Sequence, residues 1–199
     1  SRHFHICIDA TPGEGVTDAS YAEALKHASL SVNVHLAKLG IGMEPDEVEV
    51  FEREPVDPGK HLPKVAYFVT HMASHDTWNF LYFLPIVVQP TEILDGAMIW
   101  RYWEPNYFLQ NEVYIKELMK RHGKDLEFMG IVFSNNVMKI DGKDTMGMIG
   151  ATLCKETLGA DCVMLNKSGM GHCQLDSALA FNWCEKFGMD AVLNLSAVS

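Results

Sequence analysis

The sequence predicts an α/β fold, with a largely parallel, twisted sheet and helices on both faces, in layers of the Rossmann or flavodoxin kind. Apolar runs of strand length alternate along the chain with longer segments whose apolar residues recur at helical spacing. From residue 111 onward the order is helix, strand, helix, strand, helix, strand, joined by short connections. Such connections favour right-handed crossovers onto one sheet.

The first half of the chain is predicted to contain a long helix, a proline-rich loop and several short strands. Ser20 and Glu23 have the spacing of a capping box, and apolar residues follow at helical intervals until Gly40, which is suited to end the helix. Residues 54–63 hold three prolines and one glycine, so we expect a loop there. The predicted strands of this half are residues 4–9, 48–51, 65–70, 86–88 and 96–100.

The second half is predicted to contain three helices, each followed by a strand. Asn111 caps the first helix, which ends at Gly123, and Asp144 caps the second, which stops near Gly159. The third helix ends before Gly188. Its predicted apolar stripe consists of Leu175, Leu179, Trp183 and Phe187. The predicted strands are residues 128–133, 162–165 and 191–195.

The composition indicates a single domain or lobe, residues 1–199, with enough apolar content for a core. Hydrophobic residues make up 48% of the chain and charged residues 21%. The formal net charge is -10, from 16 basic and 26 acidic residues, which argues against a surface for nucleic acid or anionic membranes. We find no apolar run of about eighteen residues, so we expect no membrane span.

The thiols and the opening residues favour a cytoplasmic protein. The five cysteines are an odd number and form no Cys-x-x-Cys pair, so we expect reduced thiols. The same pattern gives no indication of a redox pair or a ribbon-type zinc site. The first residues also lack the basic-then-apolar pattern of a secretory signal.

The loop at residues 166–173 follows a predicted strand at its carboxyl end, where ligands bind in open parallel sheets. Its glycines let the backbone approach a ligand, and the amides that start the next helix favour an anion such as a carboxylate. Cys173, beside His172, is a candidate thiolate nucleophile. The alternative is a tight strand-to-helix turn with a half-buried cysteine. The residues expected to contact substrate here are Ser168, Gly169 and Gly171.

A second loop, residues 70–77, also follows a predicted strand. His75 is a candidate for proton handling, with Asp76 to orient it, and its alternative role is to cap a helix start. A zinc site that joins both loops is a further alternative, because the residue types suit zinc, although scattered histidines without metal are the default. The ligands of such a site would be His71, His75, His172 and Cys173.

Two motifs carry a resemblance to a known family. They are Val-Val-Gln-Pro-Thr-Glu-Ile-Leu-Asp-Gly-Ala at residues 87–97 and Lys-Arg-His-Gly-Lys-Asp at residues 120–125. With their surroundings, they resemble the proprotein that makes the alpha and beta subunits of component B in glycine, sarcosine and betaine reductases, to which D-proline reductase is related. The resemblance runs from about residue 3 to the end, and the family proprotein is longer at both ends.

In that family, the segment after Asp-Gly-Ala leads to an Asn-Cys pair, where the backbone breaks and the cysteine becomes a pyruvoyl group. Residues 98–107 contain no cysteine, so the cofactor of this chain stays unknown. The resemblance carries over His75 and Asp76, and it places four more residues just upstream of the break. These are Thr91, Glu92, Asp95 and Gly96, expected to bind substrate or to hold the strained peptide or, alternatively, to form an ordinary turn.

The resemblance implies a hetero-oligomeric reductase complex. In it, component B binds a small amine or betaine, a thiolate or selenolate of a partner subunit attacks the α-carbon, and a thioredoxin-type reductant completes the cycle. On this chain we expect Trp100 and Trp103 to contact a quaternary ammonium group by cation–π attraction, although clustered aromatics also form cores and subunit contacts. The expected catalytic residues are His75, Asp76, His172 and Cys173.

Two other functions remain open from the sequence. The missing Asn-Cys pair is compatible with a non-catalytic scaffold or regulatory subunit that keeps the fold. A zinc-dependent hydrolase or lyase would instead use the two loops that carry histidine and cysteine.

Overall fold

The computed structural model describes residues 7–71, 84–96, 109–167 and 171–194, and the chain divides into two units, Ser1–Glu49 and Val50–Ser199. None of the helices within the described ranges is long and apolar enough to cross a lipid bilayer.

The first unit contains helix α1, Asp18–Leu39, which ends as predicted at Gly40. The predicted cap is wrong, because Thr17 caps the helix: its side chain accepts a hydrogen bond from the Ser20 amide at 3.3 Å. Ser20 therefore lies in the first helical turn. The strand predicted at residues 4–9 is not formed at residues 7–9, the part of it that the structure describes.

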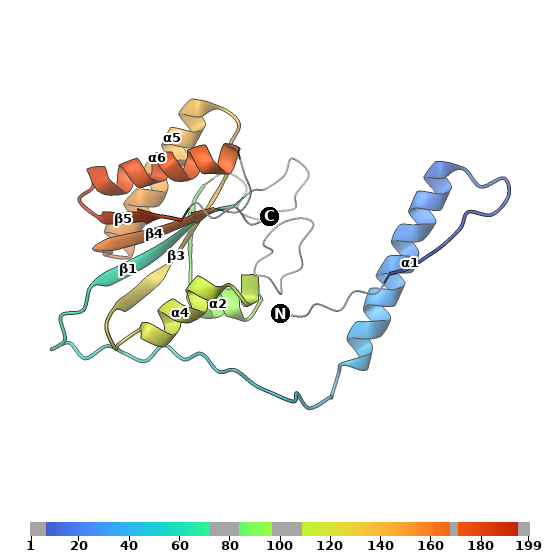
Figure 1. Cartoon of the computed structure of the whole chain (residues 1–199), viewed down its shortest axis with the longest axis horizontal. Coiled ribbons are helices and arrows are strands. Elements are labelled where there is room, and N and C mark those ends of the chain that lie inside the picture. The colour runs from blue at the N-terminus through green and yellow to red at the C-terminus, as the bar shows by residue number, and fades with distance from the viewer. Residues whose placement is uncertain (1–6, 72–83, 97–108, 168–170, 195–199) are drawn as a thin grey trace. The chain divides into compact units, whose positions relative to one another are not determined.

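The second unit is built on a five-stranded sheet with the order β2-β3-β1-β4-β5 (Figure 1). The strands are β1 Lys64–His71, β2 Ile86–Val88, β3 Glu127–Asn135, β4 Cys162–Lys167 and β5 Asp190–Leu193. Strands β3, β1, β4 and β5 run parallel, and the short edge strand β2 runs antiparallel to β3. The α/β class and the largely parallel sheet are therefore confirmed.

Helices cover both faces of this sheet, because the side chains of a strand alternate between the two faces. In β1, Tyr67 and Val69 join a core with the helices on one face, and Ala66 and Phe68 join a second core with those on the other. The first face carries α2 Pro90–Leu94 and α4 Val113–Arg121. The second carries α5 Ile140–Thr152, extended by the π-helix η1 Leu153–Thr157, and α6 His172–Lys186.

Two predicted helix caps are wrong for reasons that lie in side-chain contacts. Helix α4 is capped by Glu112 and not by Asn111, because the Glu112 carboxylate accepts the Ile115 amide at 2.8 Å. Helix α5 begins at Ile140, four residues before the predicted cap Asp144. That carboxylate instead accepts a hydrogen bond from the indole of Trp183 in α6 at 2.8 Å.

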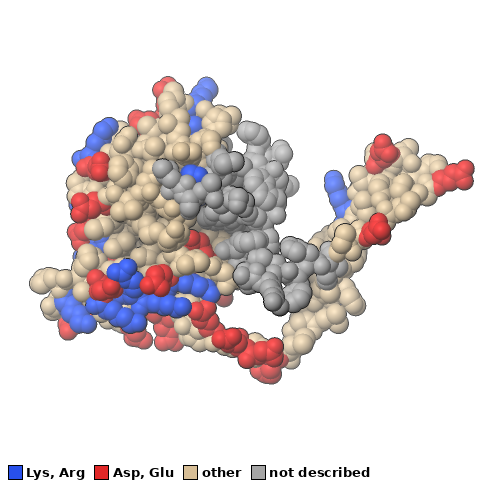
Figure 2. Space-filling model, viewed as in Figure 1, with Lys and Arg blue, Asp and Glu red and all other residues tan. Residues whose placement is uncertain are grey.

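Residues 48–51 do not form the predicted edge strand, and residues 54–63 form the predicted loop. The Glu54 carbonyl and the His122 Nε2 atom lie 2.9 Å apart, and the Lys60 ammonium donates to the Gly123 carbonyl at 3.2 Å. The loop is thus held to the turn that follows α4. On the face drawn in Figure 2, basic side chains gather over α4 with acidic ones among them, so this face carries mixed charge.

Candidate functional site

The carboxyl edge of the parallel strands is lined by buried polar residues. Strand β1 lies between β3 and β4, and Thr70 pairs with Ser134 on one side and with Lys167 on the other. Open parallel sheets bind ligands beyond the carboxyl ends of their strands, so this edge is the candidate site. The buried polar residues at the three strand ends are Thr70, His71, Ser134, Asn135, Asn166 and Lys167.

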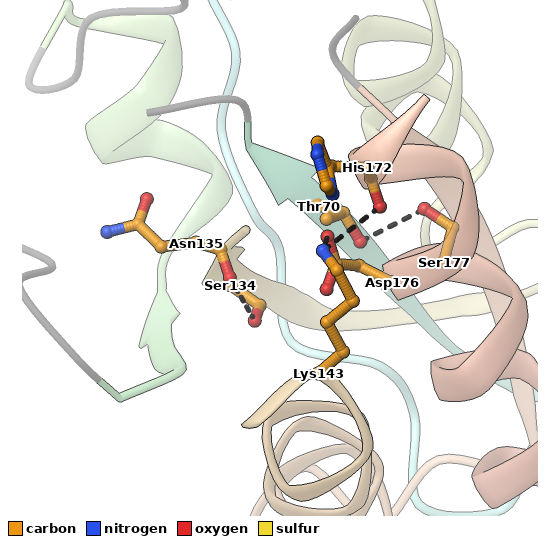
Figure 3. A network of polar contacts seen from close by, with 7 residues as sticks. All are labelled: Thr70, Ser134, Asn135, Lys143, His172, Asp176 and Ser177. Carbon is orange, nitrogen blue, oxygen red and sulfur yellow. Dashed lines mark hydrogen bonds and ion pairs between the residues drawn. The ribbon is translucent and has the colours of Figure 1, made fainter. Parts of the chain in front are cut away.

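On the α5–α6 face, the end of β1 is joined to the first turns of α6 (Figure 3). The Ser177 hydroxyl donates to the Thr70 hydroxyl oxygen at 3.0 Å. One residue earlier, the Asp176 carboxylate accepts from the Lys143 ammonium of α5 at 2.8 Å. The Lys143 ammonium also donates to the His172 carbonyl at 3.4 Å. Figure 3 shows Asn135, at the end of β3, with its amide directed away from this cluster.

The carboxyl group of Asp176 is electrostatically unusual. Burial raises its pKa above the ordinary range, and this outweighs the opposing effect of the Lys143 ammonium. Its Oδ2 atom accepts from Lys143, while its Oδ1 atom is buried and has no hydrogen-bond partner among the residues that the structure describes. The Lys143–Asp176 pair is therefore strongly desolvated, and only one of the two carboxylate oxygens has a hydrogen-bond partner among the described residues.

Helix α6 begins at the loop for which the sequence predicts ligand contact. Gly171 precedes the helix with a φ of 66°, a left-handed conformation that favours glycine, and contributes no side-chain cap. His172 is exposed, whereas Cys173 is 0% exposed and belongs to no disulfide. The imidazole is thus open to a ligand from solvent, and the thiol lies in the interior behind it.

On the α4 face, a second polar chain crosses the sheet. The Asn166 amide donates to the Tyr67 hydroxyl oxygen at 2.7 Å, and the Tyr67 hydroxyl donates to the Glu112 carboxylate at 3.2 Å. The Asn166 side-chain oxygen accepts the Lys167 amide at 2.8 Å, which fixes the backbone at the end of β4. Burial raises the pKa of Tyr67 well above its usual value, and burial likewise raises the pKa of Glu112.

The raised pKa of Glu112 predicts a specific pH dependence of stability. The folded protein keeps a proton on Glu112 at pH values where the unfolded chain has already lost it, so the unfolding free energy falls as pH rises through this window. In Glu112→Gln this contribution is absent. We expect a shallower decline of the melting temperature between about pH 4.5 and pH 7, measured by thermal unfolding. An unchanged slope would contradict the prediction.

The residues predicted beside the family motif lie at α2. Glu92 accepts the Gln89 amide at 2.7 Å and completes a capping box, so its carboxylate serves the helix start. Asp95 is the exposed C-cap, Thr91 is exposed in the helix, and Gly96 follows in a turn with a φ of 87°. The predicted strand at residues 96–100 is thus absent at its first residue. The Glu92 carboxylate therefore has a structural role at the start of α2, and the predicted substrate contact stays a prediction.

Several predicted site residues lie outside the described part of the chain. They are His75, Asp76, Trp100, Trp103, Ser168 and Gly169. Of the alternative zinc ligands, His71, His172 and Cys173 are described. His71 ends β1, and the centroid of its ring lies 6.5 Å from the ring centroid of Phe133 on the α4 face. In the described ranges, no three His, Cys, Asp or Glu side chains are grouped as a metal site requires.

Sequence reasoning missed Lys143 and Asp176 because it judged the helix faces by their largest apolar residues. It also missed Tyr67 in β1 and Glu112, the cap of α4. In α6 the predicted stripe includes Leu175, which is 43% exposed. The buried face consists of Cys173, Asp176, Ser177, Ala180 and Cys184. These residues also recur at helical spacing, so their periodicity was an available signal. Their small size lets α6 lie close to its neighbours.

Comparison with known proteins places the chain in one family. Residues 1–196 match the model of glycine/sarcosine/betaine reductase component B subunits. The chain is 33% identical to the sarcosine reductase complex component B subunit alpha of Peptoclostridium acidaminophilum, over 95% of this chain and 48% of that protein.

Two further relatives come from the same organism. The glycine reductase complex component B subunits alpha and beta are 29% identical, over 96% of this chain and 48% of that protein. The betaine reductase complex component B subunit alpha is 27% identical, over 85% of this chain and 42% of that protein. The chain thus spans about half the length of these relatives, and no solved structure matches it. The chain belongs to the family of glycine/sarcosine/betaine reductase component B subunits.

Proposed function

We propose that this chain works as a component B subunit of a reductase complex, which binds a small amine or betaine and presents its C–N bond for reductive cleavage. The observation that carries the proposal is the family match over residues 1–196. The buried polar residues at the carboxyl edge, beside the start of α6, support it, because open parallel sheets bind small ligands at this edge.

The proposed reaction needs a nucleophile from elsewhere in the complex. A thiolate or selenolate of a partner subunit attacks the α-carbon and forms a C–S or C–Se bond. The C–N bond breaks, its electron pair stays with nitrogen, and the departing amine takes up a proton. The C–S or C–Se bond is then cleaved reductively, which releases the carbon fragment with a new C–H bond and regenerates the thiol or selenol. A thioredoxin-type dithiol supplies the two electrons and two protons of this step and is oxidised to a disulfide.

This chain would contribute binding groups and a proton. The first amides of α6 suit a substrate carboxylate, because the positive end of a helix favours anions. The exposed imidazole of His172 would protonate a primary or secondary amine as it leaves, whereas the quaternary nitrogen of a betaine leaves as a neutral amine without a proton donor. His75 and Asp76 remain proposed for proton handling. Cys173 is buried, so we propose no nucleophilic role for it.

A pyruvoyl group does not fit this chain. No cysteine of the sequence follows an asparagine. Cys154, Cys162, Cys173 and Cys184 lie within helices or strands, where a break would cut the core elements. The proposed reaction therefore includes no step that uses a pyruvoyl group on this chain.

Replacement of His172 tests the proposal. In the purified complex, His172→Gln is expected to lower kcat by about 10²–10⁴-fold, the usual contribution of a general acid. The measurement is amine release from glycine and sarcosine in the presence of a dithiol. His61→Gln is the matched control, because His61 is exposed near the start of β1, at the opposite edge of the sheet. Equal turnover in both variants would remove His172 from the mechanism.

A non-catalytic scaffold is the second candidate, and the missing Asn-Cys pair favours it. Mass spectrometry of the complex separates the two. A pyruvoyl-bearing N-terminus on an associated chain supports catalysis by the complex. Intact termini on every chain, together with no amine release, support the scaffold.

A further inference from the structure

Lys143 and Asp176 form an ion pair enclosed between two helices. Lys143 is 2% exposed and Asp176 is 4% exposed. The other ion pairs recorded for the described residues, Arg121 with Asp125 and His27 with Glu23, are solvent-exposed. A buried pair recovers little more than its own desolvation cost, and apolar residues of similar size often replace it without loss of stability. Stability alone therefore does not account for these two charges.

The pair is attached to the first turn of α6. The Lys143 ammonium contacts the carbonyl of His172, the first residue of the helix, at 3.4 Å. It also contacts the carboxylate of Asp176, one turn later, at 2.8 Å. Gly171 supplies no side-chain cap, and the Lys143 ammonium links α5 to both ends of this turn.

The surroundings make this contact rigid. The Ser177 hydroxyl is bonded to Thr70 at the end of β1. A Cβ placed on Gly147 of α5 would lie 3.0 Å from the backbone nitrogen of Ala180, so the two helices meet at backbone distance. Because the helices are closely packed, removal of the ammonium group is expected to shift the backbone at the start of α6.

We propose that Lys143 and Asp176 are positioning residues, which fix the backbone at the start of α6 and thereby the position of the exposed imidazole of His172 and of the first amides of the helix. The effect of this positioning on catalysis rests on the proposed function. The positioning itself rests on the contacts of Lys143 with His172 and Asp176. Specificity of orientation, and not net stability, is what the two buried charges contribute.

The double variant Lys143→Met with Asp176→Leu tests this role. It removes both charges together, so we expect a melting temperature close to that of the wild type. We expect kcat in the full complex to fall at least tenfold. In the full chain, the NMR signal of the His172 ring, labelled at Cε1 and assigned with His172→Gln, is expected to shift.

The matched control is Arg121→Met with Asp125→Leu, which removes an exposed ion pair on α4. It is expected to change neither kcat nor the His172 signal. Wild-type kcat and an unshifted His172 signal in the buried double variant would overturn the proposal.

Asp176→Asn covers the case in which the double variant does not fold. It keeps the size of the side chain and an acceptor for Lys143, and it is expected to shift the His172 signal by a smaller amount. An unshifted signal in this variant also overturns the proposal. If the wild-type complex releases no amine from any substrate, the proposed function fails, and the NMR shift still decides the positioning role.

Discussion

Replacing Lys143 by methionine alone is expected to lower the unfolding free energy at neutral pH by about 3–5 kcal/mol, as for other broken buried pairs. The Asp176 carboxylate would remain 4% exposed, with neither its ammonium partner nor water to stabilise the negative charge. Urea unfolding at pH 7, followed by circular dichroism, measures the loss. The double variant with Asp176→Leu is expected to recover most of it.

The loss should shrink as the pH falls. The pKa of Asp176 is already raised by burial, and removal of Lys143 would raise it further. The folded variant would then hold a proton on Asp176 that the unfolded chain releases, so acidification favours the folded state. Repeating the urea titration at pH 5 checks this sign. A deficit at pH 5 equal to or larger than that at pH 7 would contradict the assignment.

Gly150→Ala is expected to destabilise the protein by about 1–3 kcal/mol or more, although alanine is the better helix former. A Cβ at this position would lie 2.3 Å from the Cζ atom of Phe68, and two other ring atoms would lie within 3.1 Å. Phe68 is 1% exposed in the core between β1 and the two helices. Its ring has no free space to enter, so α5 must move outward or the ring must leave its rotamer.

Gly142→Ala is the matched control in the same helix. Its Cβ would meet the Val137 Cγ2 atom at 3.1 Å, the end of a half-buried side chain that can turn aside. We expect a change within about 1 kcal/mol, and of either sign, because gained helix propensity offsets the close contact. Thermal unfolding of both variants compares them directly. Equal melting temperatures would show that α5 is not packed against Phe68 as described.

The sequence predicted the elements well where periodicity and glycine act locally. The strands at residues 65–70, 128–133 and 162–165, and the end of α1 at Gly40, are confirmed, with strand ends moved by one or two residues. Helix starts were predicted poorly. Asp144 has the composition of a cap, but its carboxylate is bonded to an indole of another helix, and such a partner is distant in the sequence.

The candidate site was predicted in outline. Loops after β1 and β4 were expected to carry it, and Thr70 and Lys167 are indeed register partners, so both loops leave from adjacent strands. The catalytic assignments to His75 and Asp76 stay predictions, because these residues lie outside the described ranges. The exposure of His172 and the burial of Cys173 distinguish two neighbours that the sequence treated alike.

The sequence by itself determined the α/β class, the alternation of helices and strands, and membership of the component B family, because these depend on local patterns of residues. The tertiary structure decided which residues meet at the carboxyl edge. Lys143 and Asp176 are far apart along the chain and become partners only when α5 and α6 pack on the same face of the sheet. Charge pairing is a property of the packed molecule: helical spacing can mark a buried face, but it does not tell which residue of another helix lies against that face.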